Sequence, residues 1–343
     1  MKRTLAIALC ALLLGAGCAD TGTAEPPEIG KPAAAPRDGG DLIAYTRNVR
    51  GDNEIFVARS DGSGRRRVTF GPRQANAAGN AMPAWSPDGM RIAYSAHRGT
   101  GLGGAKSALF SVRADGGGMR RLTRWFAESY LGTPAWSPDG SVITFSRHTG
   151  SWQTIEWIPA AGGSSRRLGS GPRRDSSPAW SPDGRSLAFT RLGDAGRITG
   201  EIWVMRSDGT DARRIAEDGG MASWSPDGKR IAFSSARDRF GKTYYDDRTD
   251  PNTDVYVMNA DGSRQRRLTR NRANDGTPTW SPDGRWIVFD SGRPARINFN
   301  HHLWMMRADG SCQRRLIPGR NWSLTPAWQP GRPGASFPVP RCG

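Results

Sequence analysis

A five-residue sequence, Trp-Ser-Pro-Asp-Gly, recurs along this chain and constrains its fold more than any other feature. Identical copies begin at Trp85, Trp136, Trp180, Trp224 and Trp280, and an altered copy, Trp-Gln-Pro-Gly, begins at Trp328. Neighbouring copies are 44 to 56 residues apart. A repeat of this length is typical of a solenoid, a propeller or an array, in which each unit buries its apolar face against the next.

Each repeat contains four short segments with the pattern of β-strands. An apolar segment ends in the Trp, and the Ser-Pro-Asp-Gly that follows suits a type I turn, because Pro presets φ and Gly tolerates the exit geometry. Two segments with alternating apolar residues come next, such as 91–95 and 109–112, and after an Asp-Gly turn the fourth opens with an Arg pair, such as Arg120-Arg121. Alternation with period two indicates strands. Four antiparallel strands per repeat predict a propeller blade.

The two ends of the repeated region complement each other. Residues 42–45, 55–57 and 66–69 match the second, third and fourth strands of a blade that lacks its first strand, and residues 325–328 match a first strand with no blade after it. We therefore predict an all-β protein, a six-bladed β-propeller of four-stranded antiparallel blades, with one blade shared between the N- and C-terminal strands. Joining the ends in one sheet closes the ring and leaves no open edge.

These motifs resemble the TolB-like β-propeller repeat, with its pattern Pro-Ala-Trp-Ser-Pro-Asp-Gly, Ile-Ala-Phe, Ile-Tyr-Val-Met, Asp-Gly and Arg-Arg-Leu-Thr. The resemblance covers residues 41–329 and implies the propeller fold. TolB itself carries a small α/β domain before its propeller, and we expect the propeller only, without that domain. The repeat is also similar to the propellers of prolyl oligopeptidase-like hydrolases, whose Gly-x-Ser-x-Gly elbow we do not find in this sequence.

The N-terminus predicts export. Met1-Lys2-Arg3 precedes an apolar run over residues 5–14, which is typical of a secretory signal peptide, here residues 1–17. The small residues before Cys18 resemble a lipoprotein signal-peptidase site with Cys18 acylated; ordinary cleavage nearby is the alternative. Residues 18–40 are rich in Pro, Ala, Gly and Thr and predict a flexible tether. We expect an exported protein, lipid-anchored to the outer face of the cytoplasmic membrane or to a periplasmic membrane surface.

The formal charge of +17 favours anionic partners. Such a protein is drawn to phospholipid head groups, acidic wall polymers and acidic proteins. Nucleic acid would be the cytoplasmic interpretation, and the export signal argues against it. The six Arg pairs lie on the predicted outermost strands, where charges discourage edge-to-edge pairing; a functional basic rim is the alternative. We expect a monomer.

Two cysteines remain after signal removal and acylation of Cys18. Cys312 and Cys342 are an even pair in an oxidising compartment and predict a disulfide, with free thiols as the alternative. The disulfide would hold the C-terminal tail, residues 330–343, against the propeller.

Binding is expected on one face of the ring. The loops after the second and fourth strands vary from repeat to repeat, and loops on a rigid scaffold carry specificity. The candidate residues on this face and around the channel mouth are Arg47, Arg50, His97, Trp125, Tyr130, His148, Trp152, Tyr244, Tyr245 and His301. For the aromatic residues outside the repeat positions, packing within their own loops is the alternative.

The longest insertion contains weak calcium candidates. Carboxylates are the oxygen ligands that calcium prefers, and this segment supplies Asp246, Asp247, Asp250 and Asp254. Their spacing differs from that of an EF-hand loop, and Arg239 and Arg248 are alternative partners. We therefore expect neither a metal nor a cofactor.

No catalytic residues can be recognised from spacing, so the favoured interpretation is a binding module rather than an enzyme. It would bind a protein, a peptide or an envelope polymer through its loop face and channel mouth. The alternative is a propeller lyase or hydrolase acting on an acidic polysaccharide. A third interpretation is a structural or adhesive envelope protein.

Overall fold

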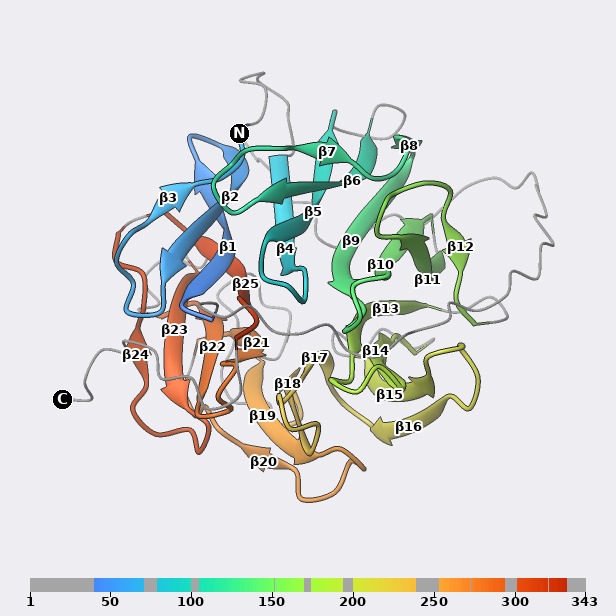
Figure 1. The fold of residues 1–343 in the computed structure, drawn as a ribbon. Helices are drawn as coiled ribbons and strands as arrows, with labels where there is room; N and C mark the ends of the chain where they lie inside the picture. Colours follow the sequence, from blue (N-terminus) through green and yellow to red (C-terminus); the bar gives the residue numbers. More distant parts are fainter. Residues whose placement is uncertain are drawn as a thin grey trace, which may run out of the picture.

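The computed structural model describes residues 40–70, 79–99, 105–150, 152–169, 174–193, 200–238, 253–271, 273–293, 301–319 and 321–331. The regular elements of these segments are β-strands, and they form six sheets arranged in a ring (Figure 1). No helix long and apolar enough to cross a membrane occurs in these segments. The predicted all-β, six-bladed architecture is confirmed.

The six blades follow the chain, and their strands run from the innermost to the outermost. Blade 1 contains β25 (Ser323–Trp328), β1 (Leu42–Val49), β2 (Asp52–Arg59) and β3 (Arg66–Arg67). Blade 2 contains β4 (Gly79–Trp85), β5 (Arg91–Arg98), β6 (Lys106–Arg113) and β7 (Arg120–Arg121). Blade 3 contains β9 (Ser129–Trp136), β10 (Val142–Thr149), β11 (Trp152–Pro159) and β12 (Arg166–Arg167).

The second half of the ring repeats this arrangement. Blade 4 contains β13 (Asp175–Trp180), β14 (Ser186–Arg191), β15 (Glu201–Arg206) and β16 (Arg213–Ala216). Blade 5 contains β17 (Gly220–Trp224), β18 (Arg230–Ser235), β19 (Asp254–Asn259) and β20 (Arg266–Arg267). Blade 6 contains β21 (Asp275–Trp280), β22 (Trp286–Ser291), β23 (His302–Arg307) and β24 (Arg314–Arg315).

The ring closes through blade 1, as the sequence predicts. Strand β25 pairs antiparallel with β1, with Ile43 opposite Trp328, and in Figure 1 the red strand lies beside the blue one. The amide of Gln329 donates to the carbonyl of Leu42 at 2.8 Å and continues the ladder. One element was not predicted: the two-residue strand β8 (Phe126–Ala127) adds to blade 2 by pairing with β6.

Every inner strand carries a bulge at the same place. The residue three positions before the Trp has φ between 44° and 57° in all six blades, and the strand register shifts there. These residues are Met82, Thr133, Ser177, Met221, Thr277 and Thr325. A bulge frees a backbone N–H from the ladder. Here that N–H is taken up by the preceding blade: Met82 N donates to Thr46 Oγ1 at 3.0 Å and Ser177 N to Ser146 Oγ at 2.8 Å.

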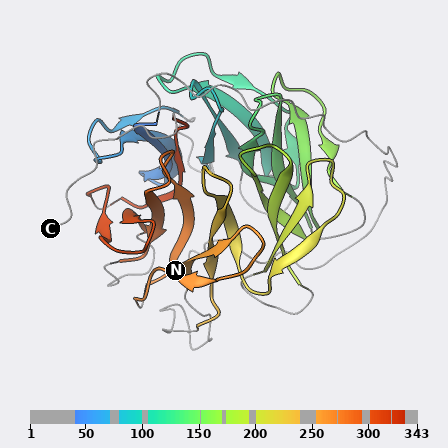
Figure 2. The same ribbon diagram turned by 60° about the horizontal axis from the view of Figure 1, so that its bottom comes forward.

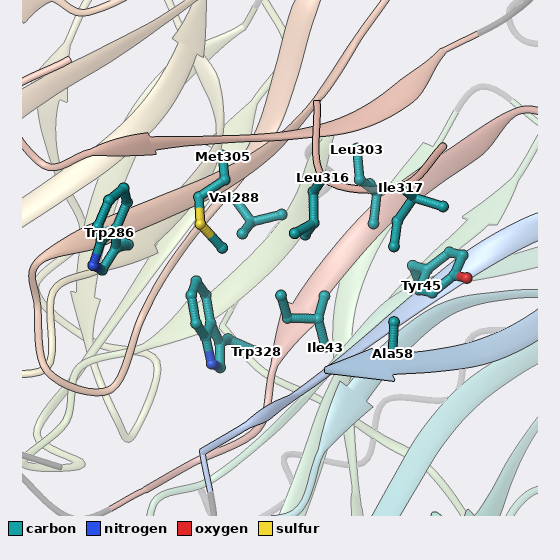
Figure 3. Close-up of a cluster of buried hydrophobic side chains, with 10 residues drawn as sticks. All are labelled: Ile43, Tyr45, Ala58, Trp286, Val288, Leu303, Met305, Leu316, Ile317 and Trp328. Carbon is teal, nitrogen blue, oxygen red and sulfur yellow. The ribbon is translucent and has the colours of Figure 1, made fainter. Parts of the chain in front are cut away.

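The core lies between the blades, and the repeated tryptophans help to form it. Figure 3 shows the closing interface, where Ile43 and Trp328 of blade 1 face Val288 and Met305 of blade 6. The indole N–H groups also connect blades: Trp85 donates to the carbonyl of Ala327 at 3.1 Å. The repeated Trp residues shown here therefore pack between neighbouring blades.

The blades present two different faces (Figure 2). The turn face carries the Ser-Pro-Asp-Gly turns and the Asp-Gly turns, and the loop face carries the connections after the second and fourth strands. Cys312, in the Asp-Gly turn region of blade 6, is disulfide-bonded. Its predicted partner Cys342 lies outside the described residues, so that pairing stays a prediction.

Candidate binding face

In two blades the connection between the second and third strands, which lies on the loop face, is shorter than the sequence suggests. Only residues 50–51 separate β1 from β2, and only residues 150–151 separate β10 from β11. Arg47 and His148 therefore lie within strands. Pairing in the sheet fixes their backbone, which a loop would not do. Arg50 lies at the tip of the first hairpin, exposed and with φ of 55°.

A ring of small polar side chains lies inside this face, one from the second strand of each blade. They are Thr46, Ser95, Ser146, Thr190, Ser234 and Asp290, each directly after the buried aromatic residue of its strand. In four blades the hydroxyl accepts the bulge N–H of the next blade, at 2.8 to 3.2 Å. These four hydroxyl groups thus connect their blades to the inner strand of the next one. Blade 6 has Asp290 at the equivalent position instead of a residue with a hydroxyl group.

In blade 6 a carboxylate replaces the hydroxyl and holds a histidine. Asp290 is 5% exposed, and its Oδ2 lies 2.7 Å from Nδ1 of His301. Burial by itself lowers the pKa of His301, but the hydrogen bond to Asp290 and the charge of Asp290 outweigh burial and raise it. Asp290 therefore holds the candidate residue His301 in blade 6 and favours its cationic form.

Three of the candidate residues form one aromatic stack on the loop face. The rings of His97 and Tyr130 are stacked with centroids 4.4 Å apart, and the edge of His148 meets Tyr130 at 5.5 Å. Tyr130 and His148 are directly opposite each other in neighbouring strands of blade 3, and His97 comes from blade 2. We call His97, Tyr130 and His148 the three-ring cluster.

The three-ring cluster is uncharged and partly accessible. Burial lowers the pKa of both His97 and His148 to about 4, so both rings are neutral at pH 7. Nε2 of His97 is buried and has no hydrogen-bond partner among the described residues. The residue Tyr130 as a whole is 40% exposed, while burial of its hydroxyl group raises its pKa to about 12. The cluster therefore offers an ordered aromatic surface between blades 2 and 3.

The remaining candidates lie apart from the cluster. Trp152 is 53% exposed and pairs with Thr149, so it lies on the opposite side of the blade 3 sheet from Tyr130. Trp125 packs on Phe110 and under the guanidinium of Arg98, which lies 4.4 Å from its ring centroid. Packing of a loop aromatic within its own blade is thus observed for Trp125.

Arg47 and the long insertion complete the set of candidates. The guanidinium of Arg47 lies 5.4 Å from the ring centroid of Phe56 in its own blade. Tyr244, Tyr245, Asp246, Asp247 and Asp250 fall outside the described residues.

Sequence reasoning missed ion pairs that join the third and fourth strands of a blade and involve the Arg pairs. The second Arg of a pair bonds a carboxylate at the start of the third strand in three blades: Arg67 to Glu54 at 2.6 Å, Arg214 to Glu201 at 2.7 Å, and Arg267 to Asp254. The signal was available, because in each case the acid stands directly before an apolar strand residue. These arginines therefore hold their own blade together, in addition to any effect at the sheet edge.

Asp254, one of the calcium candidates, is buried in such a pair. Its side chain accepts from Arg267 Nη2 and, at 3.0 Å, from Thr269 Oγ1. Burial raises its pKa to about 6, against the lowering effect of Arg267. Within the described segments no three His, Cys, Asp or Glu side chains gather as a group that could hold a metal ion.

A protein-family model matches this chain and shows the family to which it belongs. Residues 23–191 and 130–248 match the TolB beta propeller domain, which together is more than half of the chain. The chain belongs to this TolB propeller family. Among curated proteins, a match at 41% identity spans 44 residues of the uncharacterized protein Atu1656 of Agrobacterium fabrum, which is 13% of this chain and 15% of that protein.

Solved structures agree with the family at the level of the fold. TolB of Acinetobacter baumannii superposes with a TM-score of 0.65 at 21% identity, over 86% of this TolB-like chain and 68% of that one. The putative TolB of Agrobacterium tumefaciens gives 0.58 at 21% identity, over 84% and 99%. An oligogalacturonate lyase in complex with manganese gives 0.50 at 17% identity, over 81% and 74%. Identities this low show that the propeller fold is shared, and they carry no information about activity.

Proposed function

We propose that this TolB-like propeller is an exported, lipid-anchored binding module that holds a protein, a peptide or an envelope polymer against its loop face. The observation that carries the proposal is the three-ring cluster. Tyr130 is an exposed residue whose ring is held in place by the rings of His97 and His148. A side chain that is already ordered loses little conformational entropy when a partner packs on it, and tyrosine offers both an apolar ring and a polar tip.

The charges of the site favour a partner that packs on it rather than a reaction. The two imidazoles of the cluster are neutral, so a peptide side chain or the apolar face of a sugar meets no charged group there. The buried acids of blades 5 and 6 are engaged with cationic partners: Asp254 with Arg267, Asp275 with Arg293 and Asp290 with His301. The excess positive charge of the whole chain adds long-range attraction for an acidic partner.

Site-specific photo-crosslinking in cells tests this proposal. The crosslinking residue replaces Ala127, an exposed position close in sequence to Tyr130, and the control replaces Met90, which is 64% exposed on the turn face. We expect a discrete adduct from position 127 that is lost when Tyr130→Ser is added to the same chain, and a different pattern from position 90. Identical adducts from both positions, or an adduct indifferent to Tyr130→Ser, would contradict the proposal.

Two further measurements address the anchor and the enzymatic alternative. Lipid anchoring predicts that labelled fatty acid is incorporated into the wild-type chain and not into a Cys18→Ser chain. The lyase or hydrolase alternative predicts breakdown of a purified acidic polysaccharide, which a binding module leaves intact. Breakdown that depends on His301 would replace the binding proposal.

A further inference from the structure

The turn face carries a groove of about 590 Å³ between blades 5 and 6 that is lined by four arginines. Arg230 begins β18 and Arg266 begins β20 in blade 5. Arg285 follows the Ser-Pro-Asp-Gly turn of blade 6, and Arg307 ends β23. We call these four residues the arginine groove. It lies on the opposite face from the three-ring cluster.

The repeat itself shows that this groove is exceptional. Each interface between neighbouring blades has the same four positions, and only the interface of blades 5 and 6 has arginine at all of them. The equivalent set at the interface of blades 4 and 5 is Ser186, Arg213, Lys229 and Asn259. At the interface of blades 1 and 2 it is Leu42, Arg66, Met90 and Arg113.

Positive charge is in excess in the groove: its four arginines form no ion pair within the described residues, although, after the hydrogen bonds of Ser311, the charges of Arg307 and Arg266 help to lower the pKa of Asp309. Among the described residues, the ion pairs of blades 5 and 6 are formed by other side chains, those of Arg267, Arg293 and His301. The only acid in the lining is Asp309, whose Oδ1 already accepts from the amide and the hydroxyl of Ser311 at 2.8 and 2.6 Å. Arg266, Arg285 and Arg307 are exposed. The groove is therefore an exposed surface with an excess of positive charge.

Contacts within the protein hold part of this surface in place. Arg266 Nη1 donates to the backbone carbonyl of Asp309 at 2.9 Å and so links the two blades. The guanidinium of Arg230 lies 4.6 Å from the ring centroid of Trp280. Guanidinium groups bind phosphate in a planar, two-pronged geometry, and groups that are already positioned lose less entropy when they do so.

The chain enters the propeller on the same face. Gly40, the first described residue, accepts a hydrogen bond from the indole of Trp328, and Gln329 Nε2 donates at 2.9 Å to Gly89 in the first Ser-Pro-Asp-Gly turn. A tether that carries an acyl group at Cys18 therefore joins the propeller at its turn face. The attachment point of the predicted tether and the arginine groove thus lie on one face of the ring.

We propose that the arginine groove docks the propeller on a membrane by binding the phosphate groups of anionic phospholipids. The loop face then points away from the membrane toward its partner. The assignment to head groups uses the position of Gly40 and the predicted acylation of Cys18; the anion-binding property of the groove stands on the four arginines alone. The loop-face proposal is independent of it.

Vesicle binding tests the proposal with matched variants. All chains are full length and carry Cys18→Ser, so that no acyl group contributes, and binding is measured by co-sedimentation with phosphatidylcholine vesicles with and without phosphatidylglycerol. The groove variant combines Arg230→Gln, Arg266→Gln, Arg285→Gln and Arg307→Gln. The control variant removes four charges from the turn face of blades 3 and 4, by Arg166→Gln, Arg185→Gln, Arg206→Gln and Arg213→Gln. Circular dichroism and thermal unfolding confirm that each variant is folded.

We expect the unsubstituted groove to bind phosphatidylglycerol vesicles in a salt-dependent manner, and the groove variant to lose about tenfold or more of that binding. The control variant should lose markedly less, and Tyr130→Ser should lose none. Equal losses in the two four-charge variants, or binding that does not depend on phosphatidylglycerol, would overturn the proposal. Saturable binding of soluble glycerol phosphate that displaces the vesicles would assign the groove to a free phosphate ligand instead. Preferential capture of polyglutamate would assign it to an acidic protein.

Discussion

Ile43 and Trp328 lie opposite each other in one antiparallel strand pair, although they come from the two ends of the propeller. Both are buried, and together with Val288 and Met305 they fill the interface between the first and last blades. Pairing of the chain ends therefore does more than satisfy backbone hydrogen bonds, because it also completes an apolar core that neither end forms alone.

Removal of the Trp328 side chain should destabilise the protein strongly. Trp328 is 6% exposed, and truncation of a buried tryptophan to alanine leaves a cavity that costs about 3 to 5 kcal/mol. Urea denaturation followed by circular dichroism measures the free energy of unfolding of Trp328→Ala. The matched control is Trp152→Ala, an exposed tryptophan, which should change that free energy by no more than about 0.5 kcal/mol. Equal effects would show that the closing interface is not a core.

The hydroxyl of Thr46 should contribute more to stability than the equivalent hydroxyl of Ser95. Thr46 Oγ1 accepts from the bulge amide of Met82 and lies 2.7 Å from Thr325 Oγ1, so Thr46→Val leaves a donor without a partner and costs about 1 to 3 kcal/mol. Ser95 Oγ has no hydrogen-bond partner in the described part of the chain. Ser95→Ala should therefore be neutral or stabilising in the same denaturation measurement, and a larger loss from Ser95→Ala than from Thr46→Val would contradict the bulge geometry.

The two members of one Arg pair should behave differently. Arg267 is buried and pairs with the buried Asp254 and the exposed Asp238, and Arg267→Gln leaves the carboxylate of Asp254 without its cation, which costs about 3 to 5 kcal/mol. Its neighbour Arg266 is exposed, and Arg266→Gln should cost no more than about 0.5 kcal/mol. Thermal and urea unfolding of the two variants give the comparison, and similar small losses would mean that the pair acts only as surface charge.

The buried histidines should make stability depend on pH in a defined window. Burial lowers the pKa of His97 and His148 from 6.5 to about 4, so between these values the unfolded chain binds protons that the folded protein does not. The free energy of unfolding should therefore fall as the pH drops from 6.5 toward 4, by about 2 kcal/mol per histidine at pH 5. The double variant His97→Gln, His148→Gln should flatten this dependence. NMR titration of the imidazole Cε1–H signals should place His97 and His148 near 4 and His301 above its ordinary value, and an ordinary value for all three would contradict the burial.

Asp254 should change the pH dependence of stability in the direction opposite to that of the two histidines. Its pKa is raised to about 6, so the folded protein binds more protons than the unfolded chain between about pH 4 and 6. This contribution to stability is present at low pH and is lost as the pH rises through 6. Asp254→Asn should remove it. A variant whose pH dependence matches that of the unsubstituted protein would show that Asp254 is not desolvated.

The architecture was accessible from the sequence because every blade repeats the same local signals. The turn residues and the alternation around Trp85 to Trp328 fix where strands begin and end, and the missing first strand before Leu42 predicts the closure with β25. The bulges were not predicted, because the left-handed residue is Thr, Ser or Met rather than Gly. Nothing in the local sequence marks it.

The candidate sites depend on geometry between blades, which single-sequence patterns do not contain. His97, Tyr130 and His148 were each singled out as loop-face residues, but their stacking follows from the way blade 3 packs on blade 2. The arginine groove is a similar case, since its four members belong to four different strands and turns. The arginine groove is recognised when equivalent positions of the six blades are compared.

Closure of the ring by pairing of the chain ends is the claim on which the rest depends, and hydrogen–deuterium exchange measures it without any substitution. A peptide covering β25 and Gln329 should exchange as slowly as one covering the equivalent inner strand β21, because Gln329 N and the β25 amides are bonded to β1. Exchange of the β25 peptide at the rate of an unstructured chain, with β21 still protected, would contradict the closed six-bladed propeller.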